Sequence, residues 1–88
     1  MNAIRDQIER IVTSASNGAV TAEMLHKADG VLSKAGVDSM MILAIIELIE
    51  KTFAVIVESD VDPTFIESVD SIERFVRAQT GTEVQHVH

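Results

Sequence analysis

Residues 39–53 read SMMILAIIELIEKTF, and their apolar residues repeat with the period of an α-helix. Charged residues begin only at Glu47. A stripe at helical spacing is wide enough to face a core: Ile42, Ile45, Ile46, Ile49 and Phe53. We expect the others to point away from it: Met40, Met41, Ala44, Glu47, Leu48 and Lys51, with Leu43 at the boundary close to the serine. The pattern predicts a helix from Ser39 to about Phe53.

The residues just before this helix predict how it begins. Gly36 can end the preceding segment because it adopts positive φ without steric cost. Asp38 is a preferred N-cap residue. Ser39 then falls in the first turn, where backbone N–H groups are unpaired and the helix dipole favours negative charge. A phosphodiester on the Ser39 oxygen would be stabilised at that position.

The segments before residue 36 predict one helix and a long connection. Four apolar residues share one face and predict a helix over about Ala3 to Ser14, with Asn2 as its cap: Ile4, Ile8, Ile11 and Val12. Ser, Asn and Gly over residues 14–18 indicate a loop. Residues 19–37 then read as a connection with a short helical turn at 21–25. We expect Leu25 and Leu32 to enter the core.

The segments after residue 53 predict two more helices. Residues 54–57 are apolar but have no partner strand, so they read as an extended connection. Asp62-Pro63 opens a short helix that ends near Ser68. Ser68 then caps a last helix that Gly81 stops, with its apolar face at Val69, Ile72, Phe75 and Val76. The predicted fold is all-α: a bundle of three longer helices and one short one, with a long loop after the first.

Composition narrows the class of protein. The 88 residues predict one domain over 1–81 and a flexible tail over 82–88. The absence of cysteine excludes a disulfide, a thiol nucleophile and a cysteine zinc site. A net charge of −7 argues against nucleic acid and anionic membranes as partners. No apolar run reaches the roughly 20 residues of a membrane span, and charges interrupt the N-terminal segment. These features favour a cytoplasmic protein.

Several motifs occur in the order found in one family. The chain resembles the acyl and peptidyl carrier proteins over about residues 3 to 79. The resemblance rests on the Gly-x-Asp-Ser stretch at 36–39, on Phe53, the apolar run 54–57, the acidic loop with its proline turn at 60–65, and the Ser68-Val69 helix start with Ile72. It implies a carrier bundle in which Ser39 bears a 4′-phosphopantetheine arm derived from coenzyme A. It also implies that Asp38 helps to hold magnesium during attachment.

The chain departs from the family at three positions beyond the serine. Met40 stands where many carriers have leucine, a swap that conserves volume. Met41 and Ala44 stand where fatty-acid-type carriers are commonly acidic. The helix face near Ser39 is therefore apolar, and two interpretations stay open: Met40 and Met41 pack on the long loop, or they contact partner enzymes. The nine acidic residues from Asp38 to Glu73 are likewise either a solvated surface or a guide toward enzymes with basic docking patches.

The resemblance implies a free-standing, monomeric carrier that is not itself an enzyme. Its partners would be a phosphopantetheinyl transferase, an acyl- or aminoacyl-loading enzyme, and downstream synthase, condensing or tailoring enzymes. We expect Leu43 to line the arm. We expect the partner contacts to be Met40, Met41, Ala44, Glu47, Phe65 and Ile66. Fatty acyl, polyketide and aminoacyl cargo are all compatible with the sequence.

Other functions receive less support. Serine catalysis needs a positioned base, but the histidines are His26, expected in a solvent-facing loop, and two tail residues. His86 and His88 could hold a metal only with further ligands, so no metal site is predicted. The remaining alternative is a four-helix interaction adaptor without a prosthetic group.

Overall fold

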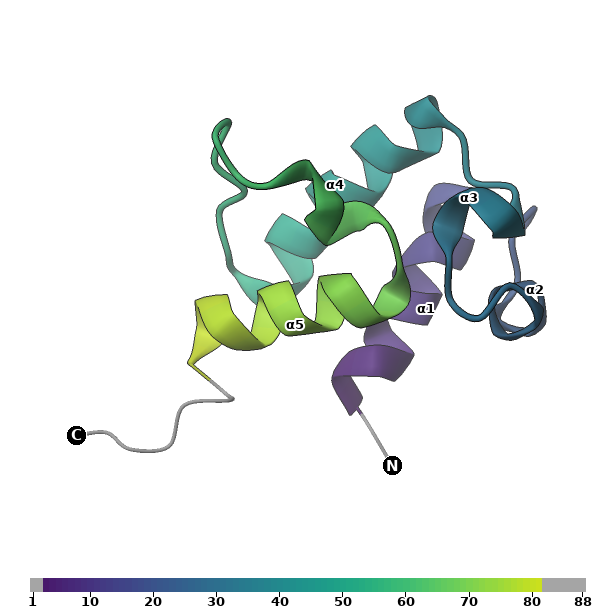
Figure 1. Cartoon of the computed structure of the whole chain (residues 1–88), viewed down its shortest axis with the longest axis horizontal. Helices are drawn as coiled ribbons and strands as arrows, with labels where there is room; N and C mark the ends of the chain where they lie inside the picture. Colours follow the sequence, from purple (N-terminus) through teal and green to yellow (C-terminus); the bar gives the residue numbers. More distant parts are fainter. Residues whose placement is uncertain (1–2, 82–88) are drawn as a thin grey trace.

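The computed structural model describes residues 3–81, which form an all-α fold (Figure 1). The helices are α1 (Ala3–Ala15), α2 (Ala22–Lys27), α3 (Leu32–Ala35), α4 (Ser39–Phe53), the 3-10 helix η1 (Pro63–Ile66) and α5 (Val69–Thr80). No strand occurs among these residues, and one isolated backbone bridge pairs Val31 with Ser68. The predicted tail and the predicted cap at Asn2 lie outside the described residues.

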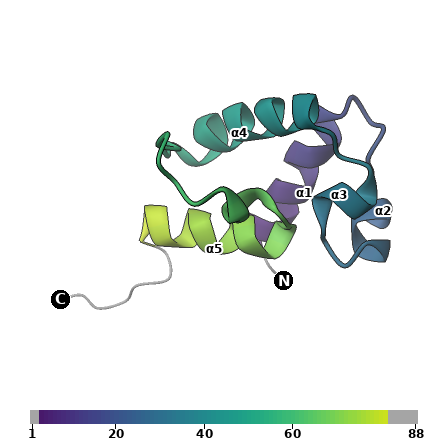
Figure 2. The same cartoon turned by 45° about the horizontal axis from the view of Figure 1, so that its top comes forward.

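The three longer helices lie where the sequence predicts them, but the connection after the first helix contains more helical structure than predicted. The bounds of α4 are those predicted, and α1 runs one residue beyond its predicted end. The short helical turn predicted at 21–25 is confirmed by α2, although α2 runs to Lys27, whereas the rest of the predicted loop is wrong because it contains a second short helix, α3. Figure 2 shows both at one end of the molecule, near the start of α4. The short third helix is a 3-10 turn and ends at Ile66.

The core forms where α1 packs against both α4 and α5. Each long helix contributes side chains with no exposed surface: Ile8 and Val12 from α1, Ile45 and Ile49 from α4, Ile72 and Val76 from α5. Leu25 and Leu32 enter this core as predicted. Complete burial of such a side chain contributes about 1.5–3 kcal/mol. The predicted outer face of α4 needs correction, because Met41 and Leu48 are half-buried and pack against the core.

A pair of backbone hydrogen bonds joins the first connection to the start of α5. The Val69 N–H donates to the Gly30 carbonyl at 2.9 Å, and the Leu32 N–H donates to the Glu67 carbonyl at 3.0 Å. Gly30 has φ +79° and is buried, and a Cβ there would meet the Val69 Cβ at 3.6 Å. The pairing therefore sets residues 30–32 directly against residues 67–69.

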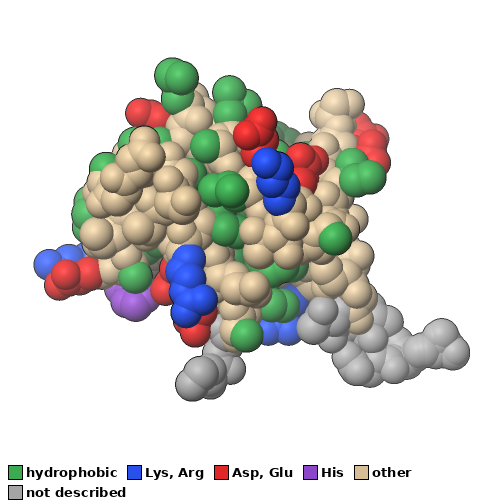
Figure 3. Space-filling view, turned by 180° about the vertical axis from the view of Figure 1, so that it is seen from behind, with side chains coloured by type: hydrophobic (Ala, Val, Ile, Leu, Met, Phe, Trp, Pro, Cys, Tyr) green, Lys and Arg blue, Asp and Glu red, His purple; other side chains and the backbone are tan. Residues whose placement is uncertain are grey.

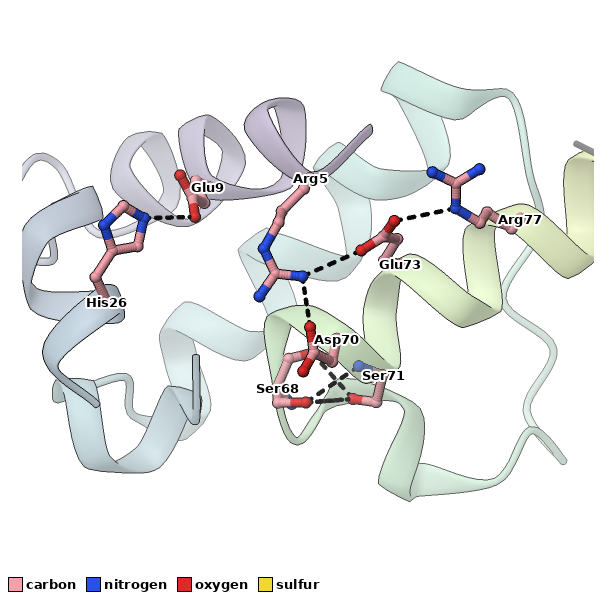
Figure 4. Close-up of polar contacts among 8 residues, drawn as sticks. All are labelled: Arg5, Glu9, His26, Ser68, Asp70, Ser71, Glu73 and Arg77. Atoms are coloured by element: carbon pink, nitrogen blue, oxygen red, sulfur yellow. Dashed lines mark hydrogen bonds and ion pairs between the residues drawn. The ribbon is translucent and has the colours of Figure 1, made fainter. Parts of the chain in front are cut away.

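Ion pairs link α1 to α5 on the outside of the core (Figure 4). Arg5 contacts both Asp70 and Glu73, and Glu73 also binds Arg77 at 3.0 Å. The hydrogen bond to Asp70 raises the pKa of Arg5 above its usual value. Partly exposed pairs of this kind each contribute up to about 1 kcal/mol, so they orient the helices more than they stabilise the core.

His26 contacts α1 from α2. Its Nε2 lies 2.9 Å from a carboxylate oxygen of Glu9 (Figure 4), and its side chain is largely exposed. The sequence placed His26 in a loop, and that placement is wrong because α2 spans it. The prediction that it faces solvent is confirmed.

The caps of the last two helical segments match their predicted residues. The Asp62 carboxylate accepts from the Thr64 N–H at 3.0 Å, and Pro63 occupies the first position of η1. Ser68 forms a reciprocal capping box with Ser71 at the start of α5 (Figure 4). Gly81 ends α5 in the left-handed conformation.

The segment after α4 is extended, as predicted, and its first residue is strained. Ala54 has φ +57° and ψ 43°, while Val55 is buried and Ile56 is exposed. The Glu50 carboxylate accepts from the Val57 N–H at 2.9 Å, which holds the segment against the end of α4. A left-handed conformation costs a residue with a Cβ roughly 1–2 kcal/mol.

Replacing Ala54 with glycine should raise the free energy of unfolding by about 0.5–1 kcal/mol, because relief of strain exceeds the added chain entropy. Urea unfolding measures the change. The same substitution at Ala78, an exposed position within α5, should lower it by about 1 kcal/mol. Two changes of the same sign would contradict the strain at residue 54.

Candidate functional site

The start of α4 is held by local hydrogen bonds that leave Ser39 exposed. Gly36 ends α3 at φ +101°, and the Val37 N–H donates to the Leu32 carbonyl at 3.0 Å. The Asp38 Oδ1 accepts from the Met41 N–H at 2.9 Å. Ser39 is therefore the first residue of the helix, directly after its cap, and its side chain faces solvent.

This placement suits a serine that receives a substituent. An exposed hydroxyl can react without any rearrangement of the core. The N-terminal end of a helix favours negative charge through its unpaired N–H groups and the helix dipole. A phosphate ester on Ser39 would therefore lie in a favourable field, although Asp38 already occupies one of the N–H donors.

An open groove of about 590 Å³ begins at Ser39. Its volume is within the range of small-molecule sites. Its lining residues come from α3, from the start of α4 and from the segment around the end of η1: Val31, Leu32, Ser33, Val37, Asp38, Ser39, Ile42, Ile66, Glu67 and Ser68. The bridge between Val31 and Ser68 joins two of its sides. The groove thus exists because the backbone pairing holds two distant segments together.

The groove is lined by Ile42 rather than by Leu43. Leu43 is 67% exposed, and it is not among the lining residues. Leu43 lies one position further along α4 than Ile42 and faces solvent. The groove therefore gives no support to its predicted role as the residue that lines the arm.

The predicted partner contacts divide into exposed and buried residues. Met40 is 78% exposed, and Glu47 is also exposed, whereas Met41 and Ala44 are half-buried. Hydrophobic side chains appear among charged ones on the rear surface in Figure 3. The described residues include four large hydrophobic side chains that are exposed: Met24, Met40, Leu43 and Ile56.

The prediction for Phe65 is wrong, whereas Ile66 remains accessible. Phe65 is only 8% exposed, and its ring centroid lies 4.5 Å from that of Phe75 on α5. The single turn of η1 directs Phe65 into the core, so it cannot form a large partner contact. Ile66 is half-buried and lines the groove.

Sequence reasoning missed the far side of the groove. Val31, Ser33, Glu67 and Ser68 line it, and no local pattern marks them as site residues. Ser68 was recognised only as a cap. The pairing of residues 30–32 with residues 67–69 brings them together, and these two segments lie more than 30 positions apart in the sequence.

Other site chemistries find no support in the part of the chain that is described. No histidine lines the groove at Ser39, so the described residues do not form a Ser–His pair there. Among residues 3–81, no group of three or more His, Asp or Glu side chains is arranged to hold a metal ion. No helix within that range has the length and apolar character needed to cross a bilayer.

No protein-family model matches this chain, and no curated protein or solved structure is significantly similar to it.

Replacing Asp38 with alanine should lower the free energy of unfolding by about 1 kcal/mol, because the Met41 N–H loses its acceptor. Chemical denaturation measures the loss. Asp38→Asn should stay close to wild type, since asparagine caps a helix as well as aspartate does. Equal losses in the two variants would show that the charge, and not the cap, stabilises the start of α4.

The pKa of Asp62 should lie below its usual value of 3.8, because the Thr64 N–H and then the Thr64 hydroxyl donate to its carboxylate. A lowered pKa in the folded state adds stability above the unfolded value, and that stability is lost as pH falls through the folded value. An NMR titration of the Asp62 carboxyl carbon measures the midpoint. Thr64→Val should raise the midpoint only partway, because the backbone donor remains. A wild-type midpoint at the usual value would contradict the cap.

Proposed function

We propose that this protein is a carrier that holds acyl, aminoacyl or polyketide intermediates on a 4′-phosphopantetheine arm attached to Ser39. The observation that carries the proposal is the position of the Ser39 hydroxyl, exposed at the capped start of α4 and next to an open groove. In this proposal α1, α4, η1 and α5 are the four helices of a carrier bundle, and α2 and α3 elaborate its first connection. We further expect a cytoplasmic monomer that is not itself an enzyme.

The residues around Ser39 fit the arm. The first turn of α4 would face the phosphodiester, whose negative charge suits a helix N-terminus. The apolar side of the groove, with Ile42 and Ile66, would contact the methyl and methylene groups of pantetheine. Ser33 and Ser68 would lie near its amides. When bound, the group supplies a terminal thiol that holds cargo as a thioester, which a chain without cysteine cannot provide.

Attachment requires a balanced transfer from coenzyme A. The Ser39 Oγ attacks the phosphorus that bears pantetheine, so an O–P bond forms and the pyrophosphate O–P bond breaks. Adenosine 3′,5′-bisphosphate leaves with the bonding electron pair, and the serine proton passes to a base of the transferase. The Asp38 Oδ1 is already engaged by the Met41 N–H. Its other oxygen would be the one that helps to position the transferase's magnesium.

Partner enzymes would dock around the start of α4. Met40 and Glu47 are exposed there, Met41 and Ala44 are half-buried beside them, and Ile66 lies across the groove. The transferase, the loading enzyme and the downstream synthase or tailoring enzymes would use this surface in turn. Tethering gives each docked active site a high effective concentration of cargo. The chain's own part is to present the arm and to be recognised.

Incubation with a promiscuous phosphopantetheinyl transferase, magnesium and coenzyme A should raise the intact mass by one phosphopantetheine. Ser39→Ala should abolish the gain, because the accepting oxygen is removed. Ser59→Ala is the control, since Ser59 is an exposed serine that does not line the groove, and it should be labelled like wild type.

An unlabelled wild-type protein, beside a control carrier that is labelled, would falsify the proposal. The exposed Met40 and Leu43 would then support the alternative, a helical adaptor that binds partners without an arm. A mass gain that persists in Ser39→Ala would place the acceptor elsewhere.

A further inference from the structure

The charges around the groove at Ser39 are all of one sign. Asp38 and Glu67 are its ionisable lining residues, and no Lys, Arg or His lines it within the described structure. Lys34 is exposed nearby in sequence, but it is not among the lining residues. A negative charge on the cargo would therefore be repelled in the groove, whereas a positive charge on the cargo would be attracted.

The two carboxylates differ in what they already bind. The Asp38 Oδ1 is engaged in capping α4 through the Met41 N–H. The Glu67 side chain is exposed and has no hydrogen-bond or ion-pair partner among residues 3–81. Glu67 is therefore the carboxylate that is available to a ligand.

The backbone of Glu67 is fixed although its side chain is not. Its N–H donates to the Thr64 carbonyl at 3.2 Å, and its carbonyl accepts from the Leu32 N–H at 3.0 Å. These bonds hold Glu67 at the edge of a groove whose other sides are largely apolar, with Val31, Val37 and Ile66. A ligand with a short apolar part and one cationic group would complement this arrangement.

We propose that the cargo class of this carrier is aminoacyl, and that the Glu67 carboxylate binds the ammonium group of the loaded amino acid. The proposal rests on the arm at Ser39 and adds the identity of what the arm holds. A cargo with a free carboxylate, such as a malonyl group, would be disfavoured by both Glu67 and Asp38. A neutral acyl group would contact the apolar side and gain nothing from Glu67.

The test uses arms that carry stable amide-linked cargo, loaded onto Ser39 from amino-coenzyme A analogues. Glycyl and propionyl groups have nearly the same shape and differ in charge, and a malonyl group supplies the opposite charge. Two-dimensional amide NMR spectra of the loaded proteins should show the largest shifts at groove residues with the glycyl group: Val31, Ser33, Ile66 and Glu67. The titration midpoint of the glycyl ammonium should be about half a pH unit higher than in Glu67→Gln.

The control is Glu58→Gln, which removes an exposed acid that does not line the groove. It should leave both the glycyl shifts and the ammonium midpoint unchanged, whereas Glu67→Gln should reduce the glycyl pattern to that of the propionyl group. Spectra of both variants without cargo verify that each is folded.

Three outcomes would overturn the assignment of cargo. They are equal NMR shifts of the groove residues with all three groups, larger NMR shifts with the malonyl group than with the glycyl group, and a titration midpoint of the glycyl ammonium that is the same in Glu67→Gln as in wild type. The absence of any mass gain at Ser39 is a separate result, since it overturns the carrier proposal itself. A loaded protein whose groove residues show no preference for the glycyl group overturns only the aminoacyl assignment and does not contradict the carrier proposal.

Discussion

The pairing of residues 30–32 with residues 67–69 holds together the two sides of the groove at Ser39. Two backbone hydrogen bonds, of 2.9 and 3.0 Å, join a segment between α2 and α3 to the start of α5. Gly30 suits the turn because its φ is +79°, a conformation that strains residues with a Cβ. The long helices would bury their apolar faces without this pairing, but the two sides of the groove at Ser39 would not be held together.

Ser39 and the groove beside it are positioned in different ways. The position of Ser39 is set locally, by Gly36 at the end of α3 and by the Asp38 cap of α4. The groove beside it is set by the long-range pairing and by Ile42 and Ile66. A local cap fixes the position of Ser39 at the start of α4, and tertiary structure then determines what lies next to it.

The sequence predicted the elements whose evidence is local, and it failed where the evidence is long-range. α4 has an apolar period over 15 residues, so its bounds could be read directly. α3 has only four residues, and a helix that short forms only through tertiary contacts, here the burial of Leu32. Phe65 was misplaced because a single 3-10 turn shows no period from which its direction could be inferred. Glu67 gave no signal, since its place in the groove follows from its backbone bond to Leu32.

The stability of the fold offers no reason for a serine at position 39. Its hydroxyl makes no hydrogen bond among the described residues, and its side chain lies outside the core. Ser68, Ser71 and Ser16, by contrast, each hold part of the backbone through their hydroxyls. The carrier proposal accounts for a serine here, because a hydroxyl exposed at the start of a helix and at the mouth of a groove can accept the arm.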